Sequence, residues 1–184
     1  MAPPPALCPR RAYATSGGGL AVSMLWLAKQ LPPDVFDRLT KNPSLASAIL
    51  EEAAGEDLPD VLQLDKAWNG IHWLLALDQG PTDAPESRLI YGGTEIGEDV
   101  AYGPGRYLTA LEVRAAADGL AKFPRDVFVK RYNPGEMDDA SVYPGGWADR
   151  PREGLDWLLE GYDRLVPYVR DAAAKGNALV TFVF

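Results

Sequence analysis

The single histidine of the chain, His72, is the side chain best suited to proton transfer near neutral pH. It lies in the largely apolar segment LDKAWNGIHWLLAL, residues 64–77. If a helix begins at Asp65, then Asp65, Asn69 and His72 share one of its faces, because residues three and four apart are neighbours on a helix. A carboxylate beside a histidine can orient the imidazole as a general acid or base, so this face is a candidate catalytic site.

A structural role accounts for the same residues. Asp65 would then be the N-cap of the helix, with its carboxylate accepting hydrogen bonds from backbone amides. His72 would be a buried residue that ties the helix to a loop. We favour this interpretation, because a catalytic His72 needs partners remote in the sequence that no motif identifies. A metal site is not expected, since one histidine and one cysteine, Cys8, are too few ligands for zinc.

Three short runs rich in glycine and aromatic residues are further candidate sites. YGGTEIG, at residues 91–97, lacks the glycine spacing of nucleotide-binding loops, so its glycines predict a turn or a close chain crossing. YGPGRY places Tyr102 and Arg106 at a turn that could bind a small anion, although we favour an ion pair between Arg106 and a carboxylate. YPGGW supplies Tyr143 and Trp147, whose amphipathic rings suit a pocket or an interface and suit equally a cover over the protein's own core.

The charge and cysteine content of the chain narrow the partners and the compartment. The chain has 26 acidic and 18 basic side chains and a formal net charge of -8, so its mean field repels nucleic acid and anionic lipid surfaces. We therefore expect neither nucleic acid nor a membrane as a partner. A lone cysteine cannot form an internal disulfide, which is typical of a protein from the reducing cytoplasm.

Length and composition predict one domain with a substantial core, since the chain has 184 residues and is 47% hydrophobic. Residues 1–22 are rich in proline and glycine and predict a flexible extension, which leaves residues 23–184 as a single domain. Arg10 and Arg11 loosely resemble a twin-arginine export signal. The apolar run after them ends without a small-x-small cleavage site, so export is not expected.

Strands and helices are predicted along the rest of the chain. Thr109 and Glu112 form a capping box, which predicts a helix that begins there and runs to about residue 122. Strands or extended segments are predicted at residues 23–28, 87–91, 102–108 and 178–184. Further helices are predicted at residues 34–39, 43–55, 65–77, 124–132 and 152–175, the last with Pro167 inside it.

The final segment, ALVTFVF at residues 178–184, determines the predicted architecture. It has no polar face, so both sides of this strand must be covered. A sheet buried on two faces needs helices above and below it, which predicts an α/β fold arranged as a three-layer α/β/α sandwich with a mixed sheet. The alternative is an α+β domain with helices on one face only.

Four segments in a fixed order, LDKAWNGIHWLL, LIYGG, AYGPGRYLTALEV and VYPGGW, are similar to those of the YfbM-like family of small bacterial proteins. The resemblance runs from about Ser23 to the C-terminal strand. It implies a compact α/β sandwich in the bacterial cytoplasm, and it implies no established activity, ligand or catalytic residue for this domain of unknown function. The positions that recur in the family are Asp65, Lys66, Trp68, His72, Tyr102, Gly103, Pro104, Tyr143, Pro144 and Trp147.

These observations predict a non-enzymatic binding or interaction domain for a protein or a small polar ligand, without a cofactor. The alternative is an unidentified hydrolase or transferase that uses His72 with a carboxylate. A third hypothesis is an immunity-type protein whose acidic surface engages a basic partner. No catalytic residue is assigned. The candidate binding surface comprises Asp65, Lys66, Trp68, His72, Tyr102, Arg106, Tyr143 and Trp147.

Overall fold

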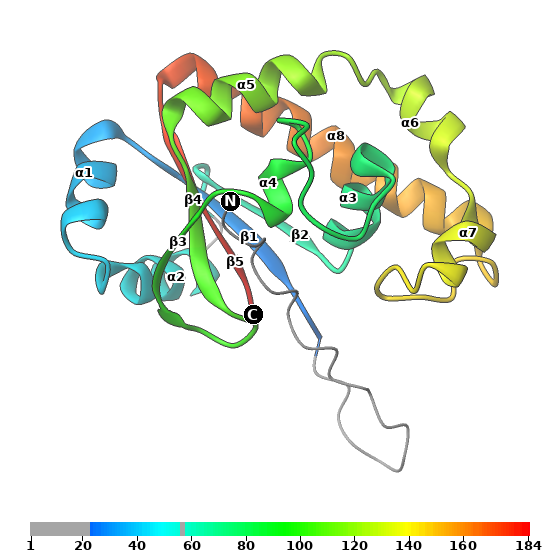
Figure 1. Ribbon diagram of the computed structural model, residues 1–184, viewed down its shortest axis with the longest axis horizontal. Helices are drawn as coiled ribbons and strands as arrows, with labels where there is room; N and C mark the ends of the chain where they lie inside the picture. Colours follow the sequence, from blue (N-terminus) through cyan, green and yellow to red (C-terminus); the bar gives the residue numbers. More distant parts are fainter. Residues whose placement is uncertain (1–22, 56–57) are drawn as a thin grey trace, which may run out of the picture.

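The computed structural model describes residues 23–55 and 58–184, which fold around a five-stranded sheet (Figure 1). The strand order is β2-β1-β5-β4-β3, and every neighbouring pair is antiparallel. The strands span Trp26–Leu31 (β1), Val61–Asp65 (β2), Thr94–Asp99 (β3), Pro104–Leu108 (β4) and Ala178–Val183 (β5). The predicted mixed sheet is therefore wrong. The apolar run of β5 predicted burial on both faces, but it does not determine the direction of the neighbouring strands, which depends on how each connection returns to the sheet.

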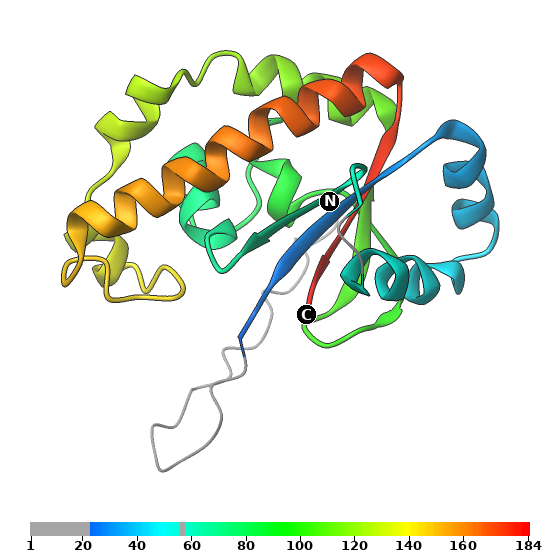
Figure 2. The same cartoon turned by 180° about the vertical axis from the view of Figure 1, so that it is seen from behind.

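Helices lie against both faces of this sheet (Figures 1 and 2). Leu179 of β5 packs into the core beneath α3, α5 and α8, whereas Val180 and Phe182 pack into a second core beneath α1 and α2. The predicted α/β class is confirmed. The helices span Pro33–Lys41 (α1), Leu45–Gly55 (α2), Trp68–Ala76 (α3), Arg88–Tyr91 (α4), Ala110–Leu120 (α5), Arg125–Arg131 (α6), Pro134–Asp139 (α7) and Pro151–Lys175 (α8).

The C-terminal strand β5 is central and buried, as its sequence predicted. It pairs with β1 on one side and β4 on the other, and Phe182 is 1% exposed. The capping box before α5 is also present, with the Thr109 hydroxyl accepting from the Glu112 amide and the Glu112 carboxylate accepting from the Thr109 amide. The long helix α8 continues through Pro167 and ends at Gly176, which has a positive φ.

Two predicted elements are wrong. The segment 87–91, predicted as a strand, contains the short helix α4, because the buried Ser87 donates its hydroxyl to the Ala84 carbonyl (2.9 Å) and begins a tight turn. Asp65, predicted as a helix N-cap, is instead the last residue of β2 and is exposed. Helix α3 begins three residues later, at Trp68, with no side-chain cap. The alternating burial of Val61–Asp65 is that of a strand, and the longer helical pattern that follows hid it.

No helix in the described part of the chain is both long and apolar enough to cross a membrane. The predicted extension at residues 1–22, with Cys8, Arg10 and Arg11, lies outside the described residues.

Candidate functional site

His72 is completely buried and holds a loop in place. Its Nε2 donates to the carbonyl oxygen of Gly80 at 2.9 Å, and its ring meets the Tyr91 ring edge to face at 4.6 Å. Burial lowers the pKa of His72, although the Gly80 carbonyl partly offsets this effect. The imidazole is therefore neutral at neutral pH. None of its hydrogen bonds among the described residues involves a carboxylate, and Asp65 lies in β2 rather than on the same helix.

Asn69, one turn before His72 in α3, joins three segments that are distant in sequence. Its side-chain amide donates to the Tyr91 hydroxyl at 2.7 Å, and its carbonyl oxygen accepts from the Tyr143 backbone amide at 2.7 Å. Asn69 is 3% exposed, so both bonds are shielded from water. The sequence spacing placed Asn69 on the same helix face as His72 but assigned no role to Asn69. A polar amide in the first turn of an apolar helix could have indicated this role, because a buried amide needs hydrogen-bond partners.

The rings held by Asn69 form the wall of a pocket, here called the tyrosine pocket, with a volume of about 440 Å³. The Trp68 ring lies 5.6 Å from that of Tyr91 and 6.1 Å from that of Tyr143. Met24, which lies just before β1, fixes two of these side chains. Its carbonyl oxygen accepts from the Trp68 indole, and its backbone amide donates to the Tyr143 hydroxyl. The pocket is lined by Met24, Trp68, Asn69, Gln79, Ile90, Tyr91, Tyr102, Pro104, Arg106, Ser141, Tyr143, Thr181, Phe182 and Val183.

Tyr91 is the polar group of this pocket that is most altered by its surroundings. Burial raises its pKa to about 12, and the hydrogen bond from Asn69 only partly opposes the shift. The phenol therefore keeps its proton across the physiological range. Its oxygen accepts from Asn69, and no hydrogen bond among the described residues uses the hydroxyl as a donor. A ligand with an acceptor oxygen can accept a hydrogen bond from this hydroxyl.

Arg106 lies at the edge of the tyrosine pocket and is already paired. Its guanidinium contacts the Glu95 carboxylate at 2.5 Å and the Gly93 carbonyl at 3.5 Å. The ion pair favoured from the sequence is present. The neighbouring Gly93 has a φ of 86°, and a Cβ there would lie 2.5 Å from the Tyr107 carbonyl oxygen, so this glycine does permit a close chain crossing.

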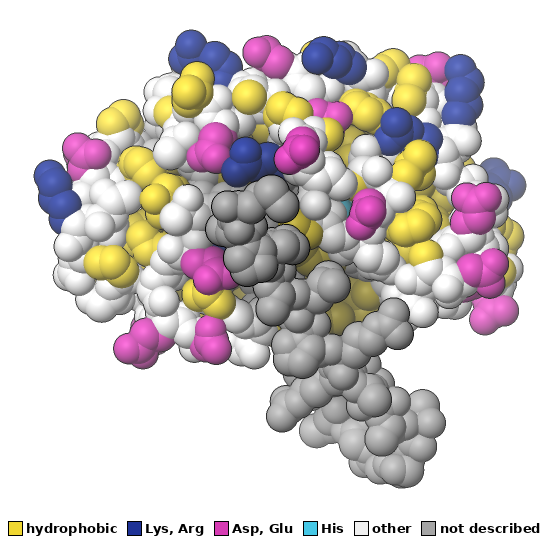
Figure 3. Space-filling view, in the orientation of Figure 1, with side chains coloured by type: hydrophobic (Ala, Val, Ile, Leu, Met, Phe, Trp, Pro, Cys, Tyr) yellow, Lys and Arg dark blue, Asp and Glu magenta, His cyan; other side chains and the backbone are white. Residues whose placement is uncertain are grey.

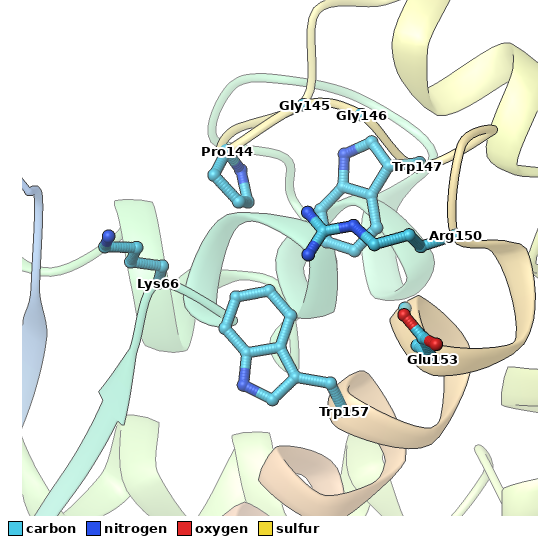
Figure 4. Close-up of a pocket in the computed structure, with 9 residues that line it drawn as sticks. Lys66, Pro144, Gly145, Gly146, Trp147, Arg150, Glu153 and Trp157 are labelled. Atoms are coloured by element: carbon cyan, nitrogen blue, oxygen red, sulfur yellow. The ribbon is translucent and has the colours of Figure 1, made fainter.

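The predicted surface divides between two pockets. Trp68, Tyr102, Arg106 and Tyr143 line the tyrosine pocket. Lys66 and Trp147 line a second one, here called the tryptophan pocket, which is formed by the 144–147 loop and the start of α8 (Figure 4). Asp65 and His72 line neither of the two. Within the described residues, no group of three His, Cys, Asp or Glu side chains is arranged to hold a metal ion.

The fold and the pockets together define a small α/β domain with an antiparallel sheet and aromatic-walled cavities around the loop after α7. The chain belongs to the family described as Domain of unknown function (DUF1877), whose model matches residues 22–182. The predicted family is confirmed.

A solved structure agrees with this assignment. The crystal structure of a protein of unknown function, YfbM from Escherichia coli, has a TM-score of 0.67 to this chain at 18% identity. The similarity covers 87% of this chain and 99% of that one, and at this identity it shows a shared fold alone. Among curated proteins, none matches the sequence.

Proposed function

We propose that this domain is a non-enzymatic binding module and that the tyrosine pocket receives a small polar ligand, free or presented by a protein. The observation that carries the proposal is the Tyr91 hydroxyl, a proton donor with no acceptor among the described residues, on the wall of an apolar cavity. Ligand pockets typically combine apolar walls with a few fixed polar groups. Asn69 fixes the position of the Tyr91 hydroxyl, because its side chain forms hydrogen bonds to Tyr91 and to the Tyr143 backbone at the same time.

The alternative, a hydrolase or transferase based on His72, has less support. A general base needs a path to the substrate, and the His72 ring is 0% exposed. Its pKa is lowered by burial, and its ring nitrogen Nε2 is occupied by the Gly80 carbonyl. These features suit a residue that stabilises the fold.

The surface gives little support to a partner chosen by charge alone. Figure 3 shows basic and acidic side chains interspersed over one face of the molecule, with apolar side chains between them. On this face, the mixed charges form no patch of a single sign that would steer an oppositely charged partner. The immunity-type hypothesis therefore ranks below ligand binding, and the cytoplasmic location stays a prediction from the cysteine content.

The test is titration with N-acetyl-phenylalaninamide and N-acetyl-leucinamide, neutral probes that combine an apolar body with carbonyl acceptors. The NMR signals of the Trp68 indole and the Asn69 side-chain amide report binding. Tyr91→Phe removes the donor and keeps the ring, so it should weaken binding by about 2- to 12-fold, the value of one hydrogen bond. Tyr107→Phe is the matched control, since Tyr107 packs against Phe36 and does not line the pocket.

Three outcomes would contradict the proposal. The first is that neither probe shifts the pocket signals, and the second is that Tyr91→Phe and Tyr107→Phe change affinity equally. The third is cleavage of N-acetyl-phenylalanine methyl ester that disappears in His72→Gln, which would establish the hydrolase instead.

A further inference from the structure

The tryptophan pocket, whose lining residues Figure 4 draws, is a second cavity of about 440 Å³. Its residues come from the β2–α3 junction, the 144–147 loop and the first turns of α8. They are Lys66, Pro144, Gly145, Gly146, Trp147, Arg150, Glu153, Gly154 and Trp157. Because its lining is separate from that of the tyrosine pocket, the two cavities can be tested independently.

Asp138 holds the end of the loop that forms this pocket through two hydrogen bonds. Its carboxylate accepts from the backbone amides of Ala148 (2.8 Å) and Trp147 (3.0 Å), and these bonds lower the pKa of Asp138. The Trp147 indole donates to the Val142 carbonyl at 2.7 Å. The loop therefore does not need to become ordered when a ligand binds, which favours affinity.

The floor of the pocket is a fixed aromatic surface. The Trp147 ring is wedged between two glycines: a Cβ at Gly70 would lie 2.9 Å from it and a Cβ at Gly154 would lie 3.2 Å from it. The Trp157 ring stacks on Trp147 with centroids 6.1 Å apart and planes 25° apart. Trp157 is half-buried, so part of its indole remains free to contact a flat group.

Arg150 adds a cation to this aromatic surface. Arg150 lines the pocket beside the two tryptophans, and Figure 4 shows its side chain extending from the start of α8 towards the pocket, with Lys66 on the opposite side and its ammonium group turned outward. Neither cation takes part in the ion pairs formed among the described residues, although Glu153 lines the same pocket. A guanidinium without a carboxylate partner is suited to bidentate contact with an oxyanion.

We propose that the tryptophan pocket binds a small oxyanion, carboxylate or phosphate, attached to a flat aromatic body. Arg150 binds the oxyanion, Trp157 stacks on the ring, and Lys66 adds positive charge at the opposite edge. This site is independent of the ligand proposed for the tyrosine pocket.

The experiment uses the full chain labelled with fluorotryptophan, whose fluorine signals are assigned by single Trp→Phe variants. Phenylacetate and phenyl phosphate are titrated beside phenylacetamide, a neutral molecule of nearly the same shape. We expect the anions to shift the Trp147 and Trp157 signals saturably and to leave the Trp68 signal unchanged. Whichever anion binds more tightly identifies the oxyanion, and added salt should weaken its binding.

Three variants sharpen the test. Arg150→Gln should weaken anion binding by about tenfold or more, since hydrogen bonds to charged groups are the strong ones. Glu153→Gln should strengthen it by about twofold, because a like charge is removed from the pocket wall. Arg152→Gln is the control, an exposed arginine in the same turn that does not line the pocket. Equal shifts from phenylacetamide and phenylacetate, or equal losses in Arg150→Gln and Arg152→Gln, would overturn the assignment.

Discussion

Asn69 and His72 show how polar side chains in a core can hold the segments around a pocket in place. Each is buried, and each forms a hydrogen bond to a segment outside α3: Asn69 to Tyr91 and Tyr143, and His72 to Gly80. A buried polar group must be hydrogen-bonded to avoid a desolvation cost of about 1 to 3 kcal/mol. The same bonds that satisfy these side chains therefore fix the loops around the tyrosine pocket.

The burial of His72 predicts that the protein loses stability in mild acid. The pKa of His72 in the folded state lies below its ordinary value of 6.5, so the unfolded chain takes up a proton first as the pH falls. The contribution of His72 to stability is thus complete above pH 6.5 and decreases as the pH falls below it, by up to about 1.4 kcal/mol per pH unit. Urea unfolding across this range measures the effect directly.

The matched variants are His72→Gln and His72→Ala. Because His72 is the single histidine of the sequence, either variant should flatten the dependence of unfolding free energy on pH just below neutrality. His72→Ala should also lower stability at neutral pH by about 1 to 3 kcal/mol. An unchanged slope in both variants would mean that His72 is not the residue responsible.

The packing of α3 against α8 depends on glycines at their contact. Gly70 in α3 faces Leu158 and Trp147, and Gly161 in α8 faces Ile71, where an added Cβ would lie 2.9 Å from the Ile71 side chain. Small residues let the two helix backbones approach closely. This contact also fixes Trp147, and with it the floor of the tryptophan pocket.

Gly70→Ala tests this contact, because two effects oppose each other. Alanine stabilises a helix interior by about 0.5 to 1 kcal/mol relative to glycine. The new methyl would, however, lie 2.7 Å from the Leu158 side chain and 2.9 Å from the Trp147 ring, and overpacking of this kind costs about 1 to 3 kcal/mol. We expect a net loss of stability in thermal unfolding. Gly135→Ala in α7, where the nearest atom is 3.6 Å away, should show no such loss, and an equal change in both variants would contradict the argument.

Buried tyrosines connect the helical layer to the sheet and to its loops. The Tyr168 hydroxyl of α8 contacts the carbonyls of Ala28 and Asp60, and the Tyr162 hydroxyl donates to the Phe123 carbonyl at 2.6 Å. Burial raises the pKa of Tyr91 and of Tyr162 to about 12 and raises that of Tyr168 further. Ionising these phenols is therefore less favourable in the folded chain than in the unfolded one.

The protein should therefore unfold cooperatively in alkali. A group whose pKa is raised in the folded state contributes stability that is complete below its ordinary pKa, here 10.0, and is lost as the pH rises towards 12. Tyrosinate absorbance and circular dichroism should change together in this window. Tyr162→Phe should reduce the pH dependence, whereas Tyr102→Phe should not, since Tyr102 is 40% exposed. Tyrosine ionisation that is complete before any loss of helix would contradict the prediction.

Local patterns in the chain were enough to predict several features of this fold. The unbroken apolar run of β5 predicted a strand covered on both faces, the spacing of Thr109 and Glu112 predicted the start of α5, and four short segments predicted the family. Each of these depends on residues adjacent in sequence or on a motif with fixed spacing. The missed strand β2 and the misassigned helix α4 lie where short segments have weak local preferences and packing determines the conformation.

The strand directions, the burial of His72 and the two pockets required contacts between distant parts of the chain. Asn69 bonds to Tyr143, which is 74 residues away, and the rings of Trp68 and Tyr91 meet only because α3 and α4 pack together. Sequence spacing carries no information on such distances, since many arrangements of the same helices and strands satisfy it. The sequence therefore identified aromatic and charged candidates, and the folded chain divided them between the tyrosine pocket, the tryptophan pocket and the core, because packing brings together residues from several elements.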